Sequence, residues 1–162
     1  LPEKEIIFLP DKNLGKYVAS KTDKKIILWE GYCEVHQNLT KKMIENLKKE
    51  NTDAKVIAHP ECTEEVLNIS DYITGTGGMA NFARLDNAKD FIIATECGMA
   101  EKLRQDVPGK NFYSFCNICP YMKMTTLPLA LESLRQNKYE ITVPNGIISK
   151  ARKALDRMLE FA

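Results

Sequence analysis

The sequence predicts a layered α/β fold with short parallel sheets, built from repeated strand, loop and helix units. Short apolar runs are typical of strands covered on both faces, and each is followed by a polar loop and a helical pattern of apolar residues. This alternation indicates parallel β-α-β units. Ligands bind beyond the carboxyl ends of the strands in such sheets, so we expect the strand-end loops along one rim. These loops lie at Pro10, Gly31, His59, Gly75, Glu96 and Cys116.

The first unit occupies residues 6–18. Ile6–Leu9 is a continuous apolar run that predicts a strand, and Pro10 ends it. Asp11 or Asn13 can then cap a helix. The apolar positions of this helix are Leu14, Tyr17 and Val18.

The second unit begins with the strand Lys25–Trp29 and continues into the polar loop Glu30–His36. Thr40 is a suitable cap for the charged helix TKKMIENLKKEN. Met43, Ile44 and Leu47 form the apolar stripe of this helix. An amphipathic helix of this kind buries one face and exposes the other.

The third unit consists of the strand Lys55–Ala58, the loop His59–Cys62 and a helix that begins at Thr63. Glu64 and Glu65 lie in the first turn of this helix, where carboxylates interact favourably with the positive end of the helix dipole. The elements of the fourth unit follow directly. They are Asp71–Thr74, the loop Gly75–Gly78, the strand Phe91–Ala94, the turn Thr95–Gly98 and a helix over Met99–Gln105.

The last part of the chain begins with the strand-like run Asn111–Phe115, which leads into a C-x-x-C loop. Two helices are predicted after it, Leu127–Leu134 and the longer Ile147–Phe161. The second is amphipathic, with apolar residues at helical spacing. These residues are Ile148, Ala151, Leu155 and Leu159.

Composition limits the classes of function. With 162 residues and 44% apolar side chains, the chain is long enough for one sizeable core or two small ones. Its formal net charge of +1 gives no strong field for nucleic acid or an anionic membrane, so we expect neither as a partner. No apolar run approaches the about 20 residues of a membrane span, and the first residues lack the pattern of a secretion signal. We therefore expect a cytoplasmic location.

The cysteines suggest a metal or redox site. Their number is five, which suits reduced thiols near a site better than a secreted disulfide framework. Cys116 and Cys119 form the C-x-x-C pair, while Cys33 and His36 form C-x-x-H. Together these four residues provide a Cys3His set for structural zinc, but iron–sulfur ligation also draws thiolates from distant loops. A plain redox pair at C-x-x-C is a third reading, and the cysteine count does not choose among them.

The loop after the third strand carries a second candidate site. His59 and Glu61 flank Pro60, which restricts the turn between them. An imidazole and a carboxylate on one tight loop can orient a carboxylate or carbonyl substrate and move protons. The Gly-rich stretch Thr74–Gly78 offers hydroxyls and backbone N–H groups that can hold a carboxylate or phosphate. It matches neither a Walker loop nor a dinucleotide fingerprint.

Six motifs occur in a fixed order, and together they resemble the C-terminal part of the quinolinate synthase (NadA) family. They are PDKNLGKYVASKT, WEGYCEVH, AHPEC, TGTGGM, ATECGM and CPYMK. The resemblance covers essentially the whole chain. It implies a fold of three-layer αβα lobes around one 4Fe–4S cluster, and a condensation of iminoaspartate with dihydroxyacetone phosphate to quinolinate in NAD biosynthesis.

The resemblance also implies roles for individual residues. Cys33 and Cys119 would be cluster ligands, which leaves Cys116 as an extra thiol, and one open iron would act as a Lewis acid toward the substrate. His36 would lie beside the cluster as a catalytic group. The other implied catalytic and substrate-binding residues are His59, Pro60, Glu61 and Thr76. The chain departs from the family pattern at Glu34, where proline is usual, and at Tyr121, where asparagine is usual.

On this resemblance, residues 1–36 are the C-terminal part of a second lobe, 37–125 a third lobe, and 126–162 a helical segment that packs back on the lobes. The N-terminal part of such an enzyme, with a third cluster cysteine, is absent from these residues. We therefore expect that the chain alone neither assembles the normal cluster nor turns over, and that this N-terminal part is its partner. The alternative is a zinc-stabilised α/β binding module without catalysis.

Overall fold

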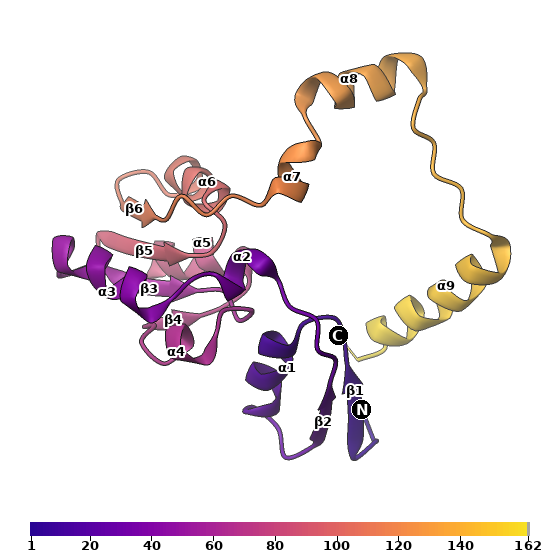
Figure 1. Cartoon of the computed structure of the whole chain (residues 1–162), viewed down its shortest axis with the longest axis horizontal. Coiled ribbons are helices and arrows are strands. Elements are labelled where there is room, and N and C mark those ends of the chain that lie inside the picture. Colours follow the sequence, from indigo (N-terminus) through magenta and orange to yellow (C-terminus); the bar gives the residue numbers. More distant parts are fainter. Residues whose placement is uncertain (162) are drawn as a thin grey trace. The chain divides into compact units, whose positions relative to one another are not determined.

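The computed structural model of the protein describes residues 1–161 (Figure 1). Within them the strands form two sheets, and every strand pair is parallel. One sheet has two strands, β1 (Glu5–Phe8) and β2 (Lys25–Leu28). The other has the order β4-β3-β5-β6. Its strands are β3 (Lys55–Ala58), β4 (Tyr72–Ile73), β5 (Asp90–Ala94) and β6 (Asn111–Ser114).

The chain divides into two compact units. One is Glu3–Pro120, which contains both sheets; the other comprises residues 1–2 and the chain from Tyr121 onward. The lobe boundaries expected at residues 36 and 125 stay predictions.

The two-stranded sheet forms a β-α-β unit with helix α1 (Lys12–Ala19). The helix packs tightly on one face of the sheet at Gly15. A Cβ atom there would lie 2.4 Å from Leu28 Cδ2 and 2.9 Å from Phe8 Cδ1. Ile7 and Ile27 are paired across the strands, and both are exposed. Helix α1 therefore covers only one face of this sheet within the described residues.

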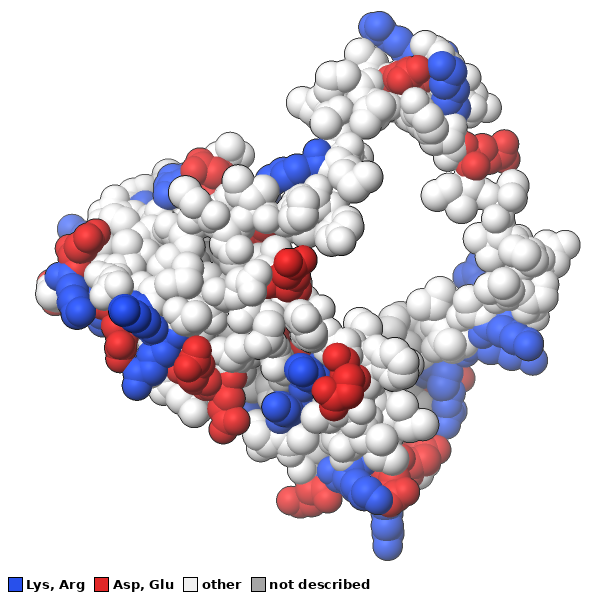
Figure 2. Space-filling view, in the orientation of Figure 1, with Lys and Arg blue, Asp and Glu red and all other residues white. Residues whose placement is uncertain are grey.

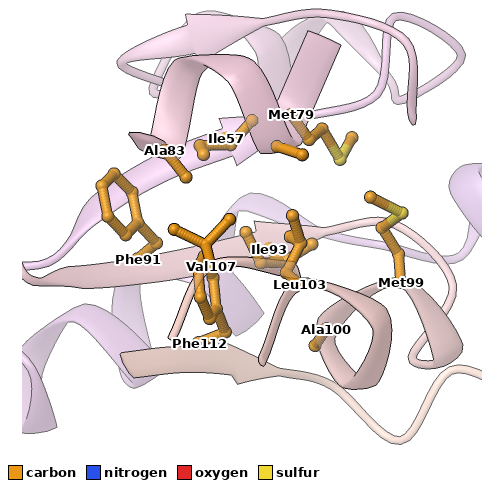
Figure 3. Close-up of a cluster of buried hydrophobic side chains, with 11 residues drawn as sticks. Ile57, Met79, Ala83, Phe91, Ile93, Met99, Ala100, Leu103, Val107 and Phe112 are labelled. Carbon is orange, nitrogen blue, oxygen red and sulfur yellow. The ribbon is translucent and has the colours of Figure 1, made fainter. Parts of the chain in front are cut away.

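The four-stranded sheet lies between two layers of helices, as the layered α/β prediction requires. On one face, α5 (Thr76–Leu85) and α6 (Gly98–Asp106) pack on Phe91 and Ile93 (Figure 3). Helices α3 (Lys41–Glu50) and α4 (Glu64–Leu67) cover the other face. The buried residues on this second face include Ile92, which is one position along β5 from Phe91. Successive strand residues thus point into two different cores.

The predicted starts of two helices are confirmed by their capping bonds. Leu14 N donates to Asp11 Oδ1 at the start of α1, and Met43 N donates to Thr40 Oγ1 at the start of α3. Thr63 precedes α4 as expected, but its side chain makes no capping hydrogen bond. Its buried hydroxyl oxygen has no partner among the protein atoms described.

Three expectations about the loops are wrong in detail. The stretch Gly75–Gly78 is not a loop throughout, because α5 begins at Thr76. Gly78 sits against the side chain of Thr74, where a Cβ atom would be 2.1 Å from Thr74 Oγ1, so this glycine serves close packing. The loop after β2 also contains a short helix, α2 (Glu34–Gln37). Finally, the strand ends belong to two sheets rather than to the rim of one.

In the chain described up to residue 161, the helices after β6 are α7 (Pro120–Met124), α8 (Leu127–Gln136) and α9 (Asn145–Leu159). The two longer ones confirm the predicted helices within about two residues. Their described side chains are not buried, and the apolar stripe of α9 is exposed at Ile148, Leu155 and Leu159. That this segment packs back on the lobes stays a prediction. No helix in residues 1–161 has the length and apolar character needed to cross a membrane.

Charged side chains of both signs are interspersed over the face shown in Figure 2. No large area of one sign dominates that view, which agrees with the near balance of 23 basic and 22 acidic residues.

Candidate functional site

The loop after β2 meets the turn after β3, and four predicted site residues come together there. His36, on α2, has Nδ1 3.0 Å from Glu61 Oε2, and His59 Nδ1 lies 3.6 Å from the same oxygen. The two imidazole rings stack with centroids 4.4 Å apart. The Cys33 thiol is close by, since the ligand atoms of Cys33, His36 and Glu61 all lie within 4.8 Å of one another. The structure therefore gathers a thiol, two imidazoles and a carboxylate within one small volume.

Asp11 fixes the backbone of Cys33. Its Oδ1 accepts a hydrogen bond from Leu14 N and its Oδ2 accepts one from Cys33 N, both at 2.7 Å. Only 3% of Asp11 is exposed. The carboxylate thus caps α1 with one oxygen and positions the candidate metal ligand with the other.

Asn13 links the same helix to the turn after β3. Its Nδ2 donates to Gln37 Oε1 at 2.9 Å and to the Glu61 backbone oxygen at 3.2 Å. Sequence reasoning considered Asp11 and Asn13 only as helix caps and missed these contacts. The available signal was their position directly after a predicted strand, at the end of the strand where such folds place their sites.

Thr95 holds the other side of the His36 ring. It follows β5, is 3% exposed, and its Oγ1 lies 2.8 Å from His36 Nε2. The loop after β6 also reaches α2, because Asn117 Nδ2 donates to the Val35 backbone oxygen. Strand-end loops from both sheets therefore converge on one site, although they do not share one sheet rim.

Burial controls the charge of the site. It lowers the pKa of His36 to about 4, with a further lowering by His59 and an opposing effect of Asp11. Burial also lowers the pKa of His59, and the Asp11 charge opposes this lowering. Burial, together with the Asp11 charge, raises the pKa of Glu61, while the hydrogen bond from Cys33 opposes that rise. Both imidazoles are therefore neutral at pH 7 and can act as ligands or hydrogen-bond acceptors.

One buried nitrogen in the site lacks a hydrogen bond. His36 Nδ1 is close to Glu61 Oε2, but the atoms do not align as a hydrogen bond, and Nδ1 has no other partner among the described protein atoms. Cys33, His36 and Glu61 each offer a ligand atom, and these atoms lie within 4.8 Å of one another. A thiol, a neutral imidazole nitrogen and a carboxylate form a donor set that suits transition metals.

The remaining predicted residues lie in different surroundings. Pro60 is buried within the turn between His59 and Glu61, while Thr76 is exposed at the start of α5. Cys119 is half-buried just before α7, and Cys116 is exposed. No cysteine of residues 1–161 forms a disulfide.

Cys62 belongs to the core and not to the site. It is fully buried, and its thiol donates to the Ala94 backbone oxygen at 3.4 Å. Burial raises the pKa of this thiol to about 12, which keeps it protonated and unsuited to metal ligation.

A cavity of about 540 Å³ lies behind the site, between α1 and α4. Its lining includes Asn13, Gln37 and Cys62, together with Lys12 and Lys16 of α1 and Lys21, which follows that helix. Its volume is in the range of small-molecule pockets. The residues that line it do not include His36, His59 or Glu61, so it is separate from the cluster of site residues.

Comparison with known proteins gives a consistent result. The family model described as Quinolinate synthetase A protein matches residues 1–160. The quinolinate synthase of Methanosarcina barkeri (strain Fusaro / DSM 804) is 45% identical over 161 residues, which cover 98% of this chain and 53% of that protein. Quinolinate synthases of Geotalea uraniireducens (strain Rf4) and Geobacter sp. (strain M21) are 46% and 44% identical, with the same coverage. The chain spans about half the length of the curated relatives it matches.

Proposed function

The chain belongs to the quinolinate synthetase A family, and on this premise we propose that it supplies the C-terminal part of a quinolinate synthase. The reaction would be the condensation of iminoaspartate with dihydroxyacetone phosphate to quinolinate, a transferase-type step of NAD biosynthesis. The observation that carries the proposal is the convergence of Cys33, His36, His59 and Glu61, which come from two separate sequence motifs of the family. A cytoplasmic location stays a prediction.

The proposed cofactor is a 4Fe–4S cluster with Cys33 and Cys119 among its ligands. The donor chemistry at Cys33 fits such a group, because its thiol lies beside a buried imidazole nitrogen without a hydrogen bond and its backbone is fixed by Asp11. Such a cluster, with one iron not held by a cysteine, would supply a Lewis acid for substrate oxygen or nitrogen.

The protein's own groups would bind and orient the substrate. Glu61 Oε2 lies 3.0 Å from His36 Nδ1 and 3.6 Å from His59 Nδ1, close to the Cys33 thiol, so its carboxyl group can hold or release a proton next to the proposed cluster ligand. His59 is less buried than His36 and presents a neutral ring to the same place. Thr76 offers an exposed hydroxyl at the N-terminus of α5, where the helix dipole favours a carboxylate.

We also propose that this chain does not turn over by itself. The curated relatives are about twice as long, which supports a requirement for residues beyond these 162. The zinc-stabilised binding module is not favoured. The family model of the quinolinate synthetases matches residues 1–160, and the relatives that the chain matches are quinolinate synthases.

A chimaera tests the proposal. This chain would replace the matching 161 residues of the Methanosarcina barkeri enzyme, and the product would be reconstituted with iron and sulfide without oxygen. We expect quinolinate from the chimaera and none from the isolated chain. Glu61→Gln should lower the rate strongly, whereas Glu45→Gln on the exposed face of α3 should not.

Two results would contradict the proposal. A chimaera with native circular dichroism and bound iron that forms no quinolinate would show that this chain lacks the activity. Turnover by the isolated 162-residue chain would show that it does not need further residues.

A further inference from the structure

We propose that the cavity between α1 and α4 binds a small organic phosphate, a molecule with a phosphate group and an apolar body. The cavity has a volume of about 540 Å³, which is in the range of small-molecule pockets. Because His36, His59 and Glu61 are not among the residues that line it, it is a second site. The inference goes beyond the proposed reaction and does not depend on it.

The charge of the cavity favours an anion. Its lining contains the lysines Lys12, Lys16 and Lys21 but a single acidic residue, Glu64. The whole chain has a formal net charge of only +1, so this excess of positive charge is local. Lys12 pairs with Glu30 at 3.4 Å, whereas neither Lys16 nor Lys21 has an ion-pair partner within residues 1–161. Two ammonium groups are therefore available to a phosphate, which lysine commonly binds.

Helix α1 and the residue after its end present these lysines together. Lys12 and Lys16 are four positions apart, so they lie on the same face of the helix. Lys21 follows the helix, and its Nζ lies 5.2 Å from the centre of the Tyr17 ring, which also lines the cavity. This cation–π contact helps to hold the Lys21 ammonium group at the cavity.

A buried hydroxyl without a partner belongs to the same lining. Thr63 lines the cavity just before α4, and its Oγ1 is buried with no hydrogen-bond partner among the described protein atoms. Buried polar atoms are rarely left in this state. Rotation of the side chain to another staggered position would let the hydroxyl donate to a phosphate oxygen, and no existing hydrogen bond would be lost.

The apolar side chains of the lining suit a ligand larger than inorganic phosphate. Leu67 of α4 and Ile73 of β4 supply aliphatic groups, and Tyr17 supplies an aromatic ring. A bare phosphate ion would fill only a small part of about 540 Å³ and would leave these side chains uncovered. Small-molecule sites typically combine apolar walls with a few placed polar groups. This combination favours a phosphate attached to an apolar body.

Part of the lining is fixed before any ligand binds. Asn13 is 7% exposed, and its Nδ2 donates to Gln37 Oε1 at 2.9 Å and to the Glu61 backbone oxygen at 3.2 Å. Asn13 and Gln37 both line the cavity. A wall that is already ordered reduces the entropy lost on binding.

Adenosine monophosphate is the probe for the experiment, because it joins a phosphate to a flat ring system. The reduced 162-residue chain, without iron or sulfide, would be titrated with it in a calorimeter. We expect one equivalent to bind, at least about tenfold more tightly than adenosine or inorganic phosphate. Added salt should weaken the binding, because it screens the lysine charges.

Variants locate the site. Lys16→Gln and Lys21→Gln should each weaken binding about threefold, and the double variant about tenfold. Thr63→Val should weaken binding about tenfold without lowering the free energy of unfolding, because the hydroxyl that it removes has no partner. Lys42→Gln, at an exposed lysine of α3 outside the lining, is the matched control and should bind like the parent chain.

The proposal is overturned if adenosine monophosphate does not bind, or if adenosine or inorganic phosphate binds as tightly. It is also overturned if the double lysine variant or folded Thr63→Val binds unchanged, or if Lys42→Gln weakens binding as much as Lys16→Gln. None of these results bears on quinolinate formation by the chimaera, which is measured separately.

Discussion

His36 and His59 stack face to face, with ring centroids 4.4 Å apart and an angle of 13° between the ring planes. One ring comes from α2 and the other from the turn after β3, so the stack joins the loops that follow two strands of different sheets. Two neutral rings tolerate this contact, whereas two imidazolium ions would repel each other. The orientation of the His36 ring matters for this stack, and the contact of Thr95 Oγ1 with His36 Nε2 helps to hold it.

Thr95→Val should destabilise the protein. Valine has nearly the same shape but leaves His36 Nε2 buried without its partner, which costs about 1–3 kcal/mol. The free energy of unfolding in urea measures the loss, and Thr95→Ser should recover most of it because serine keeps the hydroxyl. Thr52→Val, at an exposed threonine, is the control. Equal stability of the two valine variants would show that the Thr95 contact contributes nothing.

Much of the fold could be predicted because the signals are local. Apolar runs of four or five residues and the spacing of apolar positions in the helices identified β1, β2, β3, β5 and the longer helices. The placement of His59 and Glu61 after a strand, and of Cys33 and His36 after another, indicated that strand-end loops bring candidate site residues together, and the structure places these four residues side by side. These features depend on neighbours in the sequence.

The contacts that assemble the site could not be predicted in the same way. The Asp11 side chain accepts a hydrogen bond from the Cys33 backbone, 22 residues away. The Asn13 side chain donates to the backbone of a residue 48 positions away, and His36 contacts a side chain 59 residues away. Such pairings depend on which strands become neighbours. A pattern of apolar residues does not show whether six strands make one sheet or two, and it did not distinguish the loop at Gly75 from the first turn of α5.

Gly15→Ala should weaken the packing of α1 on the two-stranded sheet. The added methyl group would meet Leu28 and Phe8 at 2.4 and 2.9 Å, so the helix or these side chains must move. Overpacking of this kind typically costs about 1–3 kcal/mol, measured as the free energy of unfolding. Gly77→Ala in α5 has no atom within 4 Å of the new methyl group and should be neutral or slightly stabilising. A Gly15→Ala variant as stable as Gly77→Ala would disprove the tight contact.

Cys62 should resist alkylation in the native protein. Its thiol is fully buried, and its pKa of about 12 leaves almost no thiolate at pH 8. Cys116 is exposed and should react with iodoacetamide first. Mass spectrometry after timed alkylation measures both sites, and denaturation should make Cys62 reactive. Fast labelling of Cys62 in folded protein would place this thiol outside the core.

Asp86→Asn should reduce the sensitivity of stability to acid. The hydrogen bond from Lys55, at 2.5 Å, and one from Ala88 N lower the pKa of Asp86 below its ordinary value of 3.8. The contribution of the ionised form is thus complete above pH 3.8 and is lost as the pH falls through the lowered pKa. Urea unfolding between pH 6 and pH 2 should show a steeper acid loss in the parent than in Asp86→Asn. Parallel curves would contradict the contribution of this pair, and Asp53→Asn is the exposed control.

The Asp11 carboxylate has two roles, the cap of α1 and the bond to Cys33 N, and two substitutions can separate them. Asparagine caps helices about as well as aspartate, but its single carbonyl oxygen cannot replace both carboxylate oxygens, which accept from Leu14 N and Cys33 N in different directions. Asp11→Asn should therefore lose about 1–2 kcal/mol of unfolding free energy from the Cys33 bond alone. Asp11→Ala should lose about 1 kcal/mol more, because the cap of α1 disappears as well. If Asp11→Asn matches the parent, the Cys33 bond contributes no stability. If the asparagine and alanine variants lose equal stability, the helix cap contributes none. Only the predicted order, with alanine less stable than asparagine and asparagine less stable than the parent, fits a residue that both caps α1 and holds the Cys33 backbone.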